Sequence, residues 1–251
     1  MVAIVGIVGL GGSALLVKHR TREADLFLQK GYPALAVESV DSVRQLLTRS
    51  ETGCRSLLSA YYAGRKVERL DWAAQACAYR GFETPETYIA IAAVREWGGN
   101  DGDAIQVLSS GRQKFAKSAD LPFRMGQILV RNKKVAEAKE LFLSARTIAP
   151  ENQNLQLEIL KFLIGQEDWK NAKASADALK AANVENPELK LLLARVLQKN
   201  GDLTGSITMF EQAKTLLERL PAASRKALET RYSDVIQAIA RLNGGASGAK
   251  K

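Results

Sequence analysis

Few side chains in this sequence could carry out acid–base or metal chemistry. His19 is the single histidine, and it lies at the edge of an apolar N-terminal segment. Histidine supplies the general base of many enzymes and the ligands of many zinc sites, so neither chemistry is expected in the body of the chain. No nucleophile–base pair or metal-binding cluster takes its place. The sequence therefore favours a protein that binds other molecules over an enzyme, with no catalytic residue, no cofactor and no metal.

The two cysteines, Cys54 and Cys77, offer a different chemistry. They are not a C-x-x-C pair, and two thiols alone do not make a zinc site. The repeat described below places them opposite each other on an antiparallel helix pair. Helices usually pack about 8–10 Å apart, which is wide for the roughly 4.4–6.8 Å between Cα atoms that a disulfide needs. We expect two small core residues in contact, whereas a disulfide would imply an oxidising compartment.

The N-terminal segment contains a glycine-rich pattern that could form a phosphate-binding turn. Residues 9–14 read GLGGSA, which matches the G-x-G-x-x-A pattern of dinucleotide-binding proteins. The pattern has meaning only between a strand and a helix, and a second strand ending in an acidic residue must follow. A helical repeat is expected in that region instead, so nucleotide binding is not predicted.

The N-terminal segment is long and apolar. Residues 2–17 carry no charge, and Lys18, Arg20 and Arg22 follow directly. A cleaved signal peptide would have its positive charges before the apolar run. A spanning helix needs about 17 or more apolar residues, and basic residues stay on the cytoplasmic side. The segment predicts a transmembrane anchor over residues 1–17 in the inner (plasma) membrane, single-pass, with the rest of the chain in the cytoplasm; the alternative places the repeats in the periplasm.

The net charge of +9 indicates an acidic partner, a nucleic acid or an anionic surface. The lysines and arginines are scattered along the chain and do not alternate with aromatic residues. A protein that binds single-stranded nucleic acid interleaves the two. Nucleic acid is therefore an unlikely partner on sequence grounds.

A regular period organises the chain. Small residues recur 34 positions apart, with Leu70 at the one point where the residue is larger; the small residues are Ala36, Ala104, Ala138, Ala172 and Ser206. Apolar or small residues recur with the same period at twelve and nine positions before them and at four and seven positions after, with Arg95 as the one clear polar exception. Turn signals such as Asn200-Gly201-Asp202 separate two helical stretches in each unit. Repeats of this kind bury their apolar faces by stacking.

This pattern resembles the tetratricopeptide-repeat family, whose period is 34 residues. One unit carries the motif best, with Gly126, Leu129, Ala138, Phe142, Ala145 and Pro150. The resemblance covers about residues 17–221, and it departs from the family in lacking most terminal prolines and the large aromatic residue near the start of each unit. It implies an all-α, right-handed α-solenoid of about six helical hairpins over residues 18–221. A capping helix over 222–243 and a disordered tail over 244–251 would follow, and one continuous helix would run from Val2 to Gln29.

In such an array the first helices of the units line a concave face. The register then predicts a partner-binding groove with aromatic residues toward one end and basic residues along it: Tyr62, Trp97, Gln127, Arg131, Lys161, Arg195 and Lys199. Carboxylates of an acidic peptide or helix would pair with the basic residues, and the aromatic residues would anchor apolar side chains. Trp72 and Trp169 are expected to be packing residues.

Together these features predict a membrane-anchored protein–protein interaction scaffold that recruits or organises the partners of an envelope assembly, with residues 2–17 in the membrane. One alternative is a periplasmic assembly factor for a secretion, pilus or polysaccharide export system, which an oxidised Cys54–Cys77 pair would favour. The other is a nucleic-acid binder with a basic groove, whose affinity would fall steeply with salt.

Overall fold

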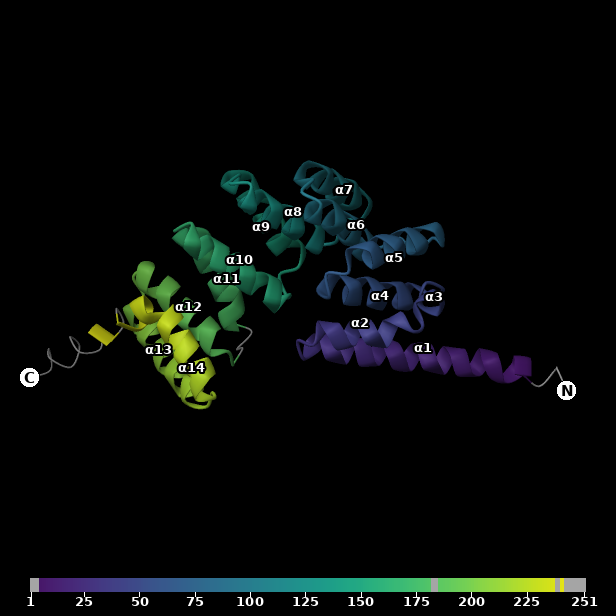
Figure 1. Ribbon diagram of the computed structural model, residues 1–251. Helices are drawn as coiled ribbons and strands as arrows, with labels where there is room; N and C mark the ends of the chain where they lie inside the picture. Colours follow the sequence, from purple (N-terminus) through teal and green to yellow (C-terminus); the bar gives the residue numbers. More distant parts are fainter. Residues whose placement is uncertain (1–4, 182–184, 238–239, 242–251) are drawn as a thin grey trace, which may run out of the picture. The chain divides into compact units, whose positions relative to one another are not determined.

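The computed structural model describes residues 5–181, 185–237 and 240–241, and the elements of this part of the chain are all α-helices (Figure 1). The predicted tail at 244–251 lies outside the described residues. In chain order the helices are α1 (Val5–Gln29), α2 (Pro33–Asp41), α3 (Arg44–Leu47), α4 (Glu51–Ala63), α5 (Val67–Tyr79), α6 (Pro85–Trp97), α7 (Asp101–Lys114), α8 (Asp120–Arg131), α9 (Val135–Ile148), α10 (Gln153–Gly165), α11 (Trp169–Ala181), α12 (Pro187–Lys199), α13 (Leu203–Glu218) and α14 (Ala222–Arg231).

The chain divides into two compact units, residues 1–145 and residues 146–251. In the first unit α1 packs with α2, α4 with α5 and α6 with α7. In the second unit α10 packs with α11 and α12 with α13. The unit boundary falls near the end of α9, whose Phe142 ring contacts Gly126 and Phe123 of α8. Both units are thus built from consecutive helical hairpins, as the 34-residue period predicts.

The periodic small residues lie where the helices meet. All six positions of the series have fully buried side chains, including Leu70 and Ser206. The backbones approach closely enough that a Cβ on Gly126 would lie 2.6 Å from the Phe142 ring. Small residues therefore set the spacing of the helices, and large apolar residues fill the space beside them.

The turn inside each hairpin also repeats. Residues with positive φ occur 34 positions apart, at Gly31, Arg65, Gly99, Lys133, Glu167 and Gly201. Their φ values lie between +49° and +85°, the left-handed region that suits glycine. Three of the six are not glycine, so the fold imposes this conformation on residues that do not favour it.

Helix α1 corrects the prediction of a membrane anchor. No helix in the described part of the chain is both long and apolar enough to span a bilayer. The uncharged run of the sequence covers residues 2–17, and its described part, Val5 to Val17 of α1, is roughly 20 Å of helix; Lys18, Arg20 and Arg22 continue the same helix. The hydrocarbon core of a bilayer is about 30 Å thick. The predicted single-pass location in the inner membrane is therefore wrong.

The position of residues 9–14 within α1 argues against a nucleotide-binding turn. Residues 9–14 lie within α1, with no strand before them among the described residues and no turn at the glycines. The prediction of one continuous helix ending at Gln29 agrees with α1, while residues 2–4 lie outside the described part of the chain. At the other end α14 begins at Ala222 as expected, but the helix breaks at Tyr232 and resumes over residues 233–237.

The two cysteines form a disulfide between α4 and α5, so the expectation of two unbonded cysteines is wrong. Both side chains are buried, and their Cα atoms are 5.9 Å apart. A usual separation of helix axes permits this bond, because Cα atoms on facing sides of two helices are closer together than the axes. Cα atoms that face each other lie about 2.3 Å inside each axis, which brings them several ångströms closer than the axes.

Candidate functional site

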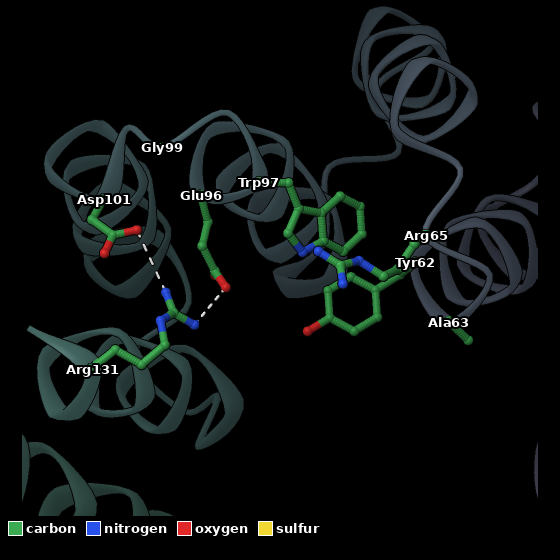
Figure 2. Close-up of a pocket in the computed structure, with 8 residues that line it drawn as sticks. All are labelled: Tyr62, Ala63, Arg65, Glu96, Trp97, Gly99, Asp101 and Arg131. Carbon is green, nitrogen blue, oxygen red and sulfur yellow. Dashed lines mark hydrogen bonds and ion pairs between the residues drawn. The ribbon is translucent and has the colours of Figure 1, made fainter.

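The first unit contains an open cleft of about 760 Å³ (Figure 2). Its walls come from the C-terminal ends of α4, α6 and α8, from the turns that follow α4 and α6, and from the first residue of α7. The lining residues are Tyr62, Ala63, Arg65, Glu96, Trp97, Gly99, Asp101 and Arg131. Three of the predicted groove residues, Tyr62, Trp97 and Arg131, therefore meet in one place.

The repeat explains why these residues meet. Ala63, Trp97 and Arg131 each stand 34 positions apart at the last turn of a first helix. Arg65 and Gly99 hold the same position in the turns that follow, with positive φ. Equivalent positions of neighbouring hairpins lie side by side in a stacked array, so one row of the repeat lines the cleft.

Aromatic rings and guanidinium groups face each other in this cleft. The rings of Tyr62 and Trp97 have centroids 5.6 Å apart and are tilted by 33°. The Arg65 guanidinium lies 5.4 Å from the centre of the Trp97 ring, and that of Arg124 lies 5.6 Å from the Tyr62 ring. These distances are within the range of cation–π attraction. The aromatic pair is thereby held as a fixed, partly exposed surface.

Glu96 forms ion pairs with two arginines, Arg124 and Arg131. Its side chain is 8% exposed and accepts hydrogen bonds from Arg124 Nη2 at 2.7 Å and from Arg131 Nη1 at 2.6 Å (Figure 2 shows the second). Arg131 Nη2 also reaches Asp101 at 3.5 Å. Arg131, predicted as a cation for an acidic partner, thus already has two acidic neighbours. Arg65 has no carboxylate partner among the described residues and is the cation more readily open to a ligand.

Gln127 lies behind the cleft. Its amide oxygen accepts a hydrogen bond of 2.8 Å from Arg124 Nη1. Arg124 donates to Glu96 as well, so Gln127 helps to orient the guanidinium that lies over Tyr62. The structure places this predicted groove residue next to the site, not in its lining.

A small apolar notch adjoins the cleft. It has a volume of about 160 Å³ and is lined by Leu58, Ser59, Tyr62, Glu86, Ile89 and Ala90. Tyr62 belongs to both hollows. One side chain of a bound segment could enter the notch while its neighbours cover the Trp97 ring, and pockets of this kind hold the anchor residues of protein interfaces.

The other predicted groove residues belong to the second unit. Arg195 and Lys199 lie 5.9 Å and 5.6 Å from the centre of the Trp169 ring. Lys161 pairs with Glu158 at 3.1 Å and with Glu188 at 3.4 Å. Trp169, expected to be a packing residue, is only half-buried and forms part of this basic surface.

The C-terminal segment engages the same surface. Asp234 lies 3.5 Å from Arg195, and the Tyr232 hydroxyl donates to Glu188 Oε1 at 2.7 Å. Burial raises the pKa of Glu188, but the Tyr232 hydroxyl and the charges of Lys161 and Arg231 outweigh it and hold that pKa below its usual value. Lys161 and Arg195 therefore already contact acidic residues of their own chain.

Several cleft residues were not predicted from the sequence. Arg65 was missed because it stands in a turn, although its register matches Gly31 and Gly99. Glu96 was missed although it stands 34 positions after Tyr62, in the same register of the repeat. Arg124 was missed because it stands fourteen positions before Ala138, outside the rows used to predict the groove. Asp101 and Trp169 occupy equivalent positions, two periods apart at the start of a second helix, and that row could have been identified from the repeat.

No family model and no curated protein matches the sequence of the chain. Several solved structures do match. The Pseudomonas aeruginosa protein pilF superposes with a TM-score of 0.57 at 15% identity, over 88% of this chain and 99% of its own. A tetratricopeptide repeat protein from Parabacteroides merdae superposes with a TM-score of 0.55 at 15% identity, and the match covers 88% of this chain and 84% of that protein.

A chain of the Naa15/Naa10 complex bound to HypK gives a TM-score of 0.57 at 16% identity, over 77% of this chain but 30% of that one. The present chain thus spans less than a third of that protein. At such identities the likeness concerns the fold alone. The fold of this chain is that of tetratricopeptide-repeat proteins.

Proposed function

We propose that this chain is a protein–protein interaction scaffold and that the Tyr62–Trp97 cleft binds a peptide segment of a partner protein. The observation that carries the proposal is an aromatic pair held at a cleft by guanidinium groups and open to solvent. Tryptophan, tyrosine and arginine are the residues most enriched among those that dominate binding energy at protein interfaces. The fold presents such residues on stacked helical hairpins.

The chemistry of the cleft indicates what the peptide carries. An apolar or aromatic side chain would cover Trp97, and a smaller one would fill the notch beside Tyr62. A carboxylate would pair with Arg65. Arg131 would join only by exchanging Asp101 for the ligand, since its contact with Asp101 is the longer of its two ion pairs. The proposal is for binding without catalysis.

Affinity purification with a cleft variant tests this function. The Tyr62→Ala/Trp97→Ala double variant should lose at least tenfold of the partner recovered by the wild type, as quantified by mass spectrometry. Tyr32→Ala is the matched control, because Tyr32 is exposed and lies in the turn between α1 and α2. Equal recovery with the cleft variant would contradict the proposed site. Recovery of nucleic acid in place of protein would favour the nucleic-acid alternative.

One observation favours the second candidate, an assembly factor for a secretion, pilus or polysaccharide export system, over an adaptor in the cytoplasm. The Cys54–Cys77 disulfide is buried, and structural disulfides persist in oxidising compartments. In this form of the proposal the partners belong to an assembly outside the reducing cytoplasm.

Thiol labelling checks the compartment. Cells are denatured rapidly in a blocking reagent, and the protein is then reduced and labelled. Both cysteines should take up label only after reduction. Cysteines that are already blocked before reduction would show that the pair is reduced in the cell. That result would favour an adaptor in the cytoplasm over an assembly factor outside it.

A further inference from the structure

A second hollow of the first unit lies between α3 and α5, away from the Tyr62–Trp97 cleft. Its volume is about 620 Å³. We call it the α3–α5 groove, and its lining residues are Gln45, Thr48, Arg49, Trp72, Gln75, Ala76, Tyr79 and Arg80. The α5 residues follow the spacing i, i+3, i+4, i+7 and i+8, which is one face of a helix. The groove therefore runs along α5 for two helical turns.

The aromatic residues of this groove are exposed. The relative exposure of Trp72 is 40% and that of Tyr79 is 93%. No other hairpin has an aromatic residue at either position: the equivalents of Trp72 are Glu38, Gln106, Glu140, Ala174 and Thr208, and those of Tyr79 are Gln45, Gln113, Thr147, Ala181 and Thr215. The repeat fold does not need an aromatic residue there. Two exposed rings on one helix face are characteristic of a binding surface.

The groove is also cationic. The Arg44 guanidinium lies 5.6 Å from the centre of the Trp72 ring. Arg49 and Arg80 line the groove and have no carboxylate partner among the described residues. The nearby acid Asp71 accepts a hydrogen bond of 2.8 Å from Gln75. Arg44 is already 3.6 Å from Asp41, so a partner that brings carboxylates to this groove would meet the guanidinium groups of Arg49 and Arg80.

Both walls of the groove are fixed to α4. On one side the disulfide bonds Cys54 of α4 to Cys77 of α5, two residues before Tyr79. On the other side α3 packs against the start of α4, so closely that a Cβ on Gly53 would clash with the carbonyl oxygen of Leu47. A groove whose walls are fixed in advance loses little conformational freedom when it binds.

We propose that the α3–α5 groove binds an acidic amphipathic helix of a partner protein. Trp72 and Tyr79 are seven residues apart on α5, about 10.5 Å along its axis. A partner helix lying along α5 repeats its own apolar residues at the same interval, so both rings can be covered at once. Its acidic flanks would pair with Arg49 and Arg80.

A single-stranded nucleic acid fits the groove less well. Such strands stack successive bases on aromatic side chains. Rings two helical turns apart on the same helix do not match bases that follow one another directly. This groove is separate from the cleft of the proposed function, so the inference goes beyond that function and can succeed or fail independently of it.

Two helical peptide libraries on the same 16-residue framework provide the probe. Both vary the apolar face, and the other positions carry glutamate in one library and lysine in the other. The full-length oxidised protein should enrich binders from the glutamate library alone. Fluorescence anisotropy of the best binder should show that Trp72→Ala, Tyr79→Ala and the Arg49→Glu/Arg80→Glu pair each weaken binding at least tenfold.

Trp97→Ala is the matched control, because it removes a tryptophan from the cleft and should leave this affinity unchanged. Hydrogen exchange of the wild-type protein should show protection along α3 and α5 when the peptide binds, a readout that requires no variant to fold. Equal enrichment from the lysine library, protection elsewhere, or displacement of the peptide from the groove by a 12-nucleotide RNA would each overturn the proposal.

Discussion

At the residue scale, individual side chains make contacts that the 34-residue repeat does not specify, and the hydrogen bond of Tyr61 is one of them. Tyr61 is fully buried, and its hydroxyl donates to Asp41 Oδ1 at 2.7 Å, while Arg69 donates to the other carboxylate oxygen at 2.6 Å. This pair joins α4 to the end of α2. Burial and the bond to Asp41 raise the pKa of Tyr61.

Tyr61→Phe should therefore lower the free energy of unfolding by about 1 kcal/mol at pH 7, the usual value of one hydrogen bond. A raised phenol pKa contributes stability that is complete below the unfolded value of about 10 and is lost as the pH rises above it. The difference between wild type and variant should shrink above pH 10. Urea unfolding at pH 7 and pH 11 measures it, with Tyr32→Phe as an exposed control, and a difference that grew with pH would contradict the argument.

Trp97 and Arg131 could be predicted from the sequence because they hold equivalent positions of the 34-residue register, and Tyr62 stands one position before that row. The ion pairs of Glu96 could not, because they depend on side chains from different helices that share no spacing. For the same reason the sequence did not reveal that Arg131 already has acidic partners. A period predicts which face a residue lies on, but it does not predict its contacts.

At the element scale, the turn of each hairpin holds one residue at positive φ. Gly99 and Gly201 adopt this conformation without strain, whereas Lys133 adopts it at a cost of about 1 kcal/mol or more. The sequence predicted these turns wherever glycine marked them. It did not predict the same conformation at Lys133, because nothing in the residue type indicates it.

Lys133→Gly should raise the free energy of unfolding by roughly 0.5 kcal/mol, since relief of the left-handed strain exceeds the entropy cost of glycine. Gly201→Ala should lower it by about 1 kcal/mol through the same strain. Urea denaturation followed by circular dichroism compares the pair. If the two substitutions had the same sign, the turns would not be under the backbone constraint described here.

The break between α2 and α3 was not predicted either. The second helix of the first hairpin ends at Asp41, and α3 begins at Arg44. No proline or glycine marks this point in the sequence. Close contact between Leu47 and Gly53 accompanies the break, and that contact depends on tertiary packing.

At the scale of the whole molecule, the chain consists of two compact units, and the disulfide belongs to the first alone. The bond closes a loop of about two dozen residues, and closing such a loop contributes about 3 kcal/mol to stability. The sequence indicated the pairing by register but underestimated how closely the two Cα atoms approach.

Reduction of the disulfide should therefore weaken hydrogen-exchange protection in α4 and α5 and leave protection in α10 to α13 unchanged. A Cys54→Ala/Cys77→Ala variant should reproduce the reduced pattern without reductant. Equal loss of protection in both units would mean that they unfold as one body.

The three tryptophans lie on three different surfaces, each with a cation over its ring: Trp72 in the α3–α5 groove, Trp97 in the cleft and Trp169 on the basic surface of the second unit. Each surface therefore contains its own natural fluorophore. Replacing two of the three by phenylalanine would leave one emission band that reports a single surface. Iodide would quench that band in the free protein and lose access to it when a partner covers the ring, so occupancy of each surface could be read optically without an added dye.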